Sequence, residues 1–92
     1  PDSPAHVLCY MLHTADLEQM SPVAWCCGSL DTLKKWLSAD NLRVNHGNLL
    51  GIQVFCDDEL DSDQLYLCTT WGKDGDFQDT QKSYKYVFRR GG

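Results

Sequence analysis

Residues 29–39 have the sequence SLDTLKKWLSA, and this stretch decides how the rest of the chain is interpreted. Ser29 is a residue type that caps helix N-termini, and Asp31 in the first turn complements the helix dipole. The apolar residues of the stretch recur at helical spacing on one face, leaving the lysines in solvent; they are Leu30, Leu33, Trp36 and Leu37. We therefore expect an amphipathic helix over residues 30–39.

Apolar and aromatic runs on both sides of this helix indicate β-strands. The runs cover residues 6–13, 22–27, 49–56, 64–71 and 83–89. The first run is continuous, which is typical of a strand buried on both faces. The expected order is strand, strand, helix, strand, strand, strand. This order predicts an α+β fold, with a mixed sheet of about five strands and one helix packed across it.

The 92 residues are enough for one domain with a modest core. The chain starts with Pro1-Asp2-Ser3-Pro4 rather than with Met, so we expect residues 1–4 to be the remnant of a linker from a larger protein. Residues 5–89 would then form a single α+β domain, and residues 90–92 a C-terminal tail.

The last four residues are Arg89, Arg90, Gly91 and Gly92. Only glycine lets a backbone enter a narrow enzyme tunnel without steric conflict, and ubiquitin-like modifiers expose such an end. The element order together with this end resembles the ubiquitin-like β-grasp fold over nearly the whole chain. The compact size, the lack of a credible catalytic set and a charged edge strand predict a non-catalytic protein–protein interaction module of a larger intracellular protein, ubiquitin-like in type. The alternative is a modifier ending in Gly-Gly, or a polyprotein segment released by a papain-like protease.

Charge is distributed unevenly along the chain. The net charge of −5 disfavours non-specific binding to phosphate backbones. Acidic residues gather in residues 57–63, whereas the last strand is basic. A basic strand at the edge of a sheet can accept an extended or acidic segment of a partner protein. The candidate contacts are Lys34, Lys35, Lys85, Arg89 and Arg90.

The last strand also alternates aromatic with basic residues, a combination found in proteins that bind single-stranded nucleic acid. Tyr84, Tyr86 and Phe88 share one face, and Lys85 and Arg89 share the other. The same alternation is expected of an edge strand with an aromatic core face and a basic outer face. We favour the second interpretation because the whole chain is acidic, and keep nucleic-acid binding as an alternative.

The five cysteines are an odd number, and Cys26 and Cys27 are adjacent. This pattern disfavours a secreted disulfide framework and indicates reduced thiols in an intracellular, cytoplasmic protein. Because Cys9, Cys56 and Cys68 lie in apolar runs, we expect them to be buried. Cysteine pairs at zinc-binding spacing and a membrane-spanning apolar run are absent from the sequence. We therefore expect no metal and no cofactor. We also expect no catalysis, because a module of 92 residues with a single core offers little room for a catalytic cleft.

Overall fold

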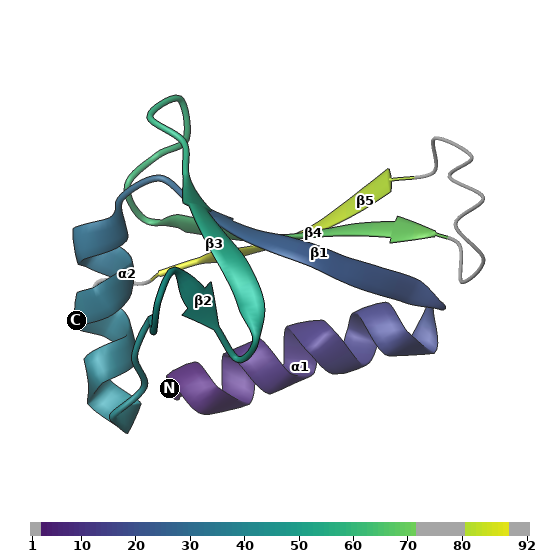
Figure 1. Ribbon diagram of the computed structural model, residues 1–92, viewed down its shortest axis with the longest axis horizontal. Coiled ribbons are helices and arrows are strands. Elements are labelled where there is room, and N and C mark those ends of the chain that lie inside the picture. The colour runs from purple at the N-terminus through teal and green to yellow at the C-terminus, as the bar shows by residue number, and fades with distance from the viewer. Residues whose placement is uncertain (1–2, 72–80, 89–92) are drawn as a thin grey trace.

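A computed structural model describes residues 3–71 and 81–88 (Figure 1). The chain begins with helix α1 (Pro4–Leu17), continues through strand β1 (Met20–Cys27) and helix α2 (Leu30–Leu37), and adds a short 3-10 helix η1 (Ser38–Asp40). Four strands follow: β2 (Asn48–Leu49), β3 (Ile52–Cys56), β4 (Gln64–Trp71) and β5 (Gln81–Val87).

The five strands form one sheet in the order β2-β3-β1-β4-β5. Strand β1 is parallel to β3 and antiparallel to β4, and β4 is antiparallel to β5. The sheet is therefore mixed, and the predicted α+β class is confirmed. The described residues contain two α-helices, α1 and α2, rather than the one expected.

Residues 6–13 form part of helix α1, so their assignment to a central strand was wrong. Ser3 caps the helix by accepting a hydrogen bond from the backbone N–H of His6, and Pro4 occupies the first turn, where no N–H is needed. These two residues were expected to belong to a linker. The buried residues of α1 recur at helical spacing rather than alternating; they are Pro4, Val7, Leu8, Met11 and Ala15.

Helix α2 agrees with the prediction from residues 29–39. The Ser29 hydroxyl accepts a hydrogen bond from the backbone N–H of Thr32 at 3.2 Å, which confirms the N-cap. Leu33 and Leu37 are fully buried, while the lysines of the helix are exposed. The regular helix ends at Leu37, and η1 continues it to Asp40, whose carboxylate accepts a bond from the N–H of Ala5 at the start of α1.

The run at residues 49–56 is interrupted by a tight turn between β2 and β3. Leu50 and Gly51 have φ angles of 53° and 80°. Two successive residues with positive φ are typical of the turns that match the twist of a two-residue hairpin. Gly51 adopts this conformation without the steric penalty of a side chain.

One face of the sheet carries the core. Trp25 and Cys27 of β1 and Leu65 and Leu67 of β4 belong to the same buried cluster as the apolar faces of α1 and α2. Helix α1 runs beneath the sheet, and α2 lies across one end of it (Figure 1). The alternate residues of the same strands point to the opposite face, which is covered by no described helix. We call this the open face.

Candidate functional site

Strand β5 lies at one edge of the sheet, because β4 is its sole partner among the described residues. Its side chains alternate: Tyr84 and Tyr86 are half-buried, Phe88 just beyond the strand is buried, and Lys85 and Val87 are exposed. The ring centroids of Tyr86 and Phe88 lie 5.5 and 4.7 Å from that of Trp36 in α2. The aromatic side chains thus hold β5 against the helices, and the Tyr86 and Phe88 rings are not free to stack with nucleic-acid bases.

The backbone of β5 leaves hydrogen-bonding groups directed away from the sheet. The Phe88 N–H bonds to the Asp63 carbonyl at 2.7 Å, and the Lys82 carbonyl accepts a bond from the Thr69 hydroxyl at 2.8 Å. Residues of even number therefore face β4. Because residues of an antiparallel pair alternate between facing the partner and facing away, the N–H and C=O groups of Ser83, Lys85 and Val87 point to the free edge.

A groove of about 540 Å³ runs between α1 and this strand. The helix lines it with residues at helical spacing, so that one stripe of α1 faces β5. Tyr10 in this stripe is 65% exposed, whereas Val7 and Met11 form the buried floor. The lining residues are His6, Val7, Tyr10, Met11, Thr14, Ser83, Tyr84, Lys85 and Tyr86.

The far end of α1 is connected to β5 through Glu18. Its carboxylate accepts hydrogen bonds from the Lys82 ammonium and the Tyr84 hydroxyl. The bond from Lys82, followed by that from Tyr84, lowers the pKa of Glu18. The pKa of Lys82 is raised by the same carboxylate, and that of Tyr84 is raised first by burial and then by Glu18. Lys82 is therefore engaged with α1.

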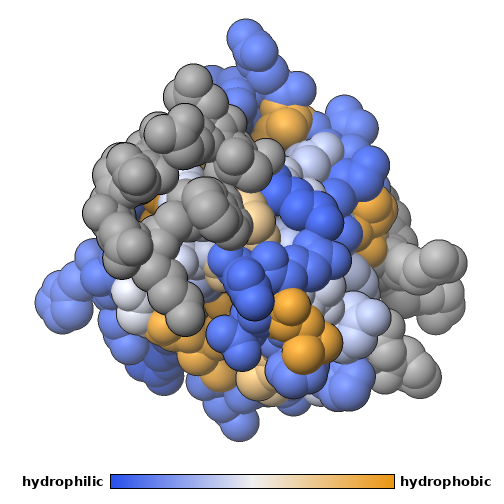
Figure 2. Space-filling model, turned by 90° about the vertical axis from the view of Figure 1, so that its right-hand side faces the viewer, coloured by the Kyte–Doolittle hydropathy of each residue, from blue (hydrophilic) through white to orange (hydrophobic). Residues whose placement is uncertain are grey.

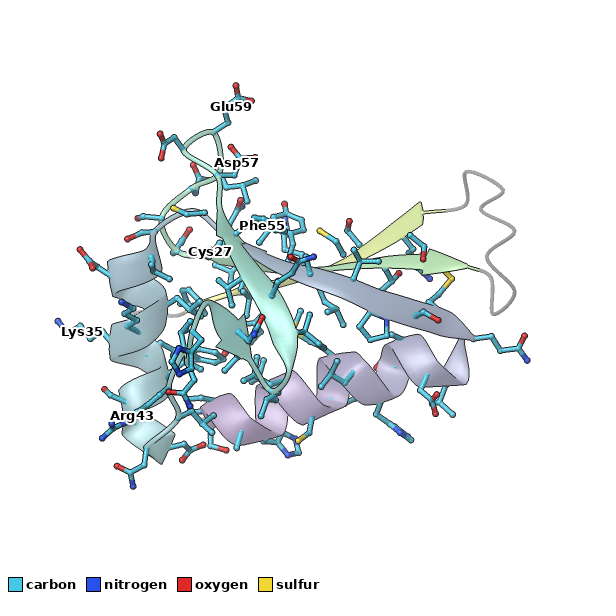
Figure 3. All side chains as sticks on the ribbon, in the orientation of Figure 1. Cys27, Lys35, Arg43, Phe55, Asp57 and Glu59 are labelled. Carbon is cyan, nitrogen blue, oxygen red and sulfur yellow. The ribbon has the colours of Figure 1, made fainter. Side chains whose placement is uncertain are left out.

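The predicted basic contacts do not gather at one place. Lys85 lines the groove beside β5, whereas Lys34 lines a second hollow together with Arg43. Lys35 points outward from α2, on the side away from the sheet (Figure 3). Arg89 and Arg90 lie outside the described residues, as do Gly91 and Gly92 of the tail.

The acidic residues 57–63 project from the end of β3, and Asp57 and Glu59 stand at the tip of the molecule in Figure 3. The Asp57 N–H bonds to the Cys27 carbonyl at 2.8 Å, and the Asp57 carboxylate accepts a bond from the Glu59 N–H at 2.9 Å. This loop is thus fixed to the end of β1. The right-hand end of the molecule in Figure 1, where α1 finishes, is mostly hydrophilic with separate apolar areas (Figure 2).

The cysteines are free thiols, but their burial differs from the prediction. Cys9 and Cys56 are exposed and Cys68 is half-buried, whereas Cys27 is fully buried. Cys9 is exposed because the helical period places it on the solvent side of α1. Cys56 is the exposed last residue of β3, in register with the buried Cys27 of β1.

Residues of α1 are the part of the groove that the sequence interpretation missed. A strand over residues 6–13 would have placed Val7 and Met11 on one face and Tyr10 on the other. In the helix all three lie along one stripe facing β5. The Ser3-Pro4 start and the helical spacing of the apolar residues through Ala15 were the signals that could have identified it.

None of the described helices is long and apolar enough to cross a membrane. Within the described ranges, no group of three or more His, Cys, Asp or Glu side chains is arranged as metal ligands. Comparisons of this chain with protein-family models, curated proteins and solved structures find no match.

Proposed function

We propose that this chain is a protein-recognition domain that binds an extended segment of a partner protein along the free edge of β5. Its activity is binding rather than catalysis. The observation that carries this proposal is the position of a strand edge, with which no other described strand pairs, directly beside a groove lined by α1. An edge supplies backbone hydrogen bonds, and a groove supplies side-chain selectivity.

The backbone contribution comes from Ser83, Lys85 and Val87. Their outward N–H and C=O groups are the donors and acceptors that an added strand needs. Every partner segment carries matching backbone groups, whatever its sequence. The backbone hydrogen bonds therefore provide affinity without selecting side chains.

Selectivity comes from the two faces of the added strand. Alternate side chains of the bound segment would point toward α1, where Val7, Met11 and Tyr10 favour apolar groups. The intervening side chains would lie on the open face near Lys85, which favours carboxylates. Lys82 is already engaged with Glu18, so Lys85 is the described lysine of β5 that remains for a partner. The preferred segment is therefore extended, with apolar and acidic residues in alternation.

A single position of β5 offers a sharp test of strand addition. Lys85→Pro removes an N–H that points to the free edge, and proline is tolerated on edge strands when the lost donor faces outward. Lys85→Ala removes the charge but keeps the N–H. Peptides selected from a phage-displayed random library on the native protein would be measured by fluorescence anisotropy against both variants.

We expect the proline variant to abolish binding and the alanine variant to weaken it by less than about tenfold, as is usual for a rim charge. Circular dichroism and thermal unfolding check that each variant is folded. Tyr10→Ala, which empties one wall of the groove, should weaken binding more than Leu17→Ala, since both residues are exposed on α1 but Leu17 lies outside the groove. Selected peptides that bind the folded proline variant normally would rule out strand addition at β5.

A further inference from the structure

Two cysteines lie side by side on the open face of the sheet. The Sγ atoms of Cys26 in β1 and Cys68 in β4 are 3.4 Å apart. Cys26 is paired in register with Tyr66, and Cys68 with Ala24, so the two cysteines are diagonal neighbours across antiparallel strands. The register shifts between Pro22 and Ala24, at the bulge next to this pair. The two sulfur atoms are therefore in contact although their residues are not directly opposite.

The other cysteines are placed differently. Cys27 points into the core and is fully buried, on the opposite face from Cys26. Cys9 lies alone on the outer side of α1. Cys56 is exposed at the end of β3, where it lies in register with Cys27 and interacts with its buried thiol. Cys26 and Cys68 are both half-buried, so their pair combines contact between the sulfur atoms with access from solvent.

We propose that Cys26 and Cys68 form a reversible disulfide when the protein meets a small-molecule disulfide oxidant. The Cys68 thiolate attacks one sulfur of the oxidant, the oxidant's S–S bond breaks, and one small thiolate leaves and takes up a proton. Cys26 then loses its proton and attacks the Cys68 sulfur, which releases the second small thiol. The protein loses two electrons and two protons, and the oxidant is reduced to two thiols.

The order of attack follows from the surroundings of Cys26. Burial, followed by the contact with Cys68, raises the pKa of the Cys26 thiol to about 12. Cys26 is thus a poor first nucleophile, because the thiolate is the reactive form. Once Cys68 carries the mixed disulfide, the Cys26 sulfur is already beside it. The second attack is therefore intramolecular and needs no collision with a thiol from solution.

Reversibility follows from the diagonal arrangement. A disulfide requires the sulfur atoms to approach from 3.4 Å to about 2.05 Å with a restricted dihedral angle. Diagonal strand positions meet these requirements with some distortion, and distorted disulfides are more easily reduced. The bond would link the two central strands covalently and leave both helices in place.

The test uses a background variant, Cys9→Ser with Cys56→Ser, which removes the two exposed thiols that would otherwise form mixed disulfides. This background variant, in its folded state, is incubated with oxidised glutathione. The intact protein and its peptides are then analysed by mass spectrometry. We expect a loss of two hydrogen atoms without a glutathione adduct, a mapped bond between Cys26 and Cys68, and full reversal by dithiothreitol.

Adding Cys68→Ser to the background should abolish the two-hydrogen loss. The same peptide mapping on the unaltered protein keeps the test independent of whether the background variant folds. Glutathione adducts without an internal bond, an internal bond that includes Cys27, or no reaction before unfolding would each overturn the proposal.

Discussion

Substituting Gly28 by alanine tests a close approach between two backbone segments. Gly28 lies between β1 and α2, where the loop of residues 57–63 crosses it. A Cβ atom at this position would lie 2.0 Å from the carbonyl oxygen of Asp61 and 2.8 Å from that of Leu60. Since ordinary contact begins near 3.4 Å, the Asp61 oxygen would have to move by about 1.4 Å, the difference between 3.4 and 2.0 Å.

The loop cannot move freely by this distance. The Gly28 N–H bonds to the Gln64 carbonyl at 3.3 Å, and the Gln64 N–H bonds to the Asp61 carbonyl at 3.1 Å. Displacing the loop would weaken both bonds, each worth about 1 kcal/mol net, in addition to the strain of overpacking, which is typically 1–3 kcal/mol. We expect Gly28→Ala to lower the free energy of unfolding by at least about 2 kcal/mol.

Urea unfolding followed by tryptophan fluorescence measures this loss, and thermal unfolding should show Tm lower by roughly 8–16 °C for a domain of this size. Gly51→Ala is the matched control, because its Cβ would meet no atom within 4 Å but its φ of +80° disfavours alanine. Strain alone should lower its stability by about 1 kcal/mol. If Gly28→Ala is no more destabilising than Gly51→Ala, the close approach between the loop and β1 is not as described.

Three further predictions concern α1 and β5. Leu8→Ala should lower the free energy of unfolding by about 2–5 kcal/mol, whereas Cys9→Ser on the exposed side of the same turn should change it by less than about 0.5 kcal/mol; equal effects in urea unfolding would contradict the helical period. Amide exchange along β5, followed by NMR, should alternate, with the Lys85 N–H exchanging fast and the Tyr84 N–H protected, and uniform protection would mean that the edge is covered. Because the fold lowers the pKa of Glu18, its ionised carboxylate stabilises the fold at pH values above the ordinary pKa of 4.5. This contribution is lost as the pH falls through the lowered pKa. Glu18→Gln should therefore reduce stability at pH 7 but not at pH 2, and an equal reduction at both pH values would exclude the charged interaction.

The elements with a clear period were predictable from sequence. Helix α2 was identified from its Ser29 cap and its stripe of leucines because both signals are local. The alternation along β5 was predicted for the same reason, and its position at the edge of the sheet is confirmed. Local patterns determine which face of an element is apolar.

Helix α1 was missed because a short continuous apolar run fits a buried strand and a buried helix equally well. Residues 7–12 are all apolar, so their period cannot be read from hydrophobicity alone. The length of the segment decides the question, since 14 helical residues from Pro4 to Leu17 exceed a typical strand. Because of this error the groove was not predicted, since five of its nine lining residues belong to α1.

The position of Lys34 and Lys35 relative to β5 could not be derived from sequence. Their exposure follows from the helical period, but which hollow they border depends on how α2 packs across the sheet. Trp36 makes the contact with β5, and the lysines beside it therefore point elsewhere. Their role in binding a partner stays a prediction, as does that of Arg89 and Arg90.

The central position of β1 has a consequence for the folding kinetics. Its neighbours in the sheet are distant along the chain, since Cys27 lies beside Cys56 and Met20 beside Trp71. Closing such long loops is entropically unfavourable before the pairing contacts form, so domains with this kind of pairing fold more slowly than helical bundles. Strands β4 and β5 are consecutive and can pair earlier, with the apolar residues of β4 still uncovered. Refolding from denaturant should therefore give a lower yield at higher protein concentration, because an early β4–β5 pair can associate with another copy before β1 reaches it.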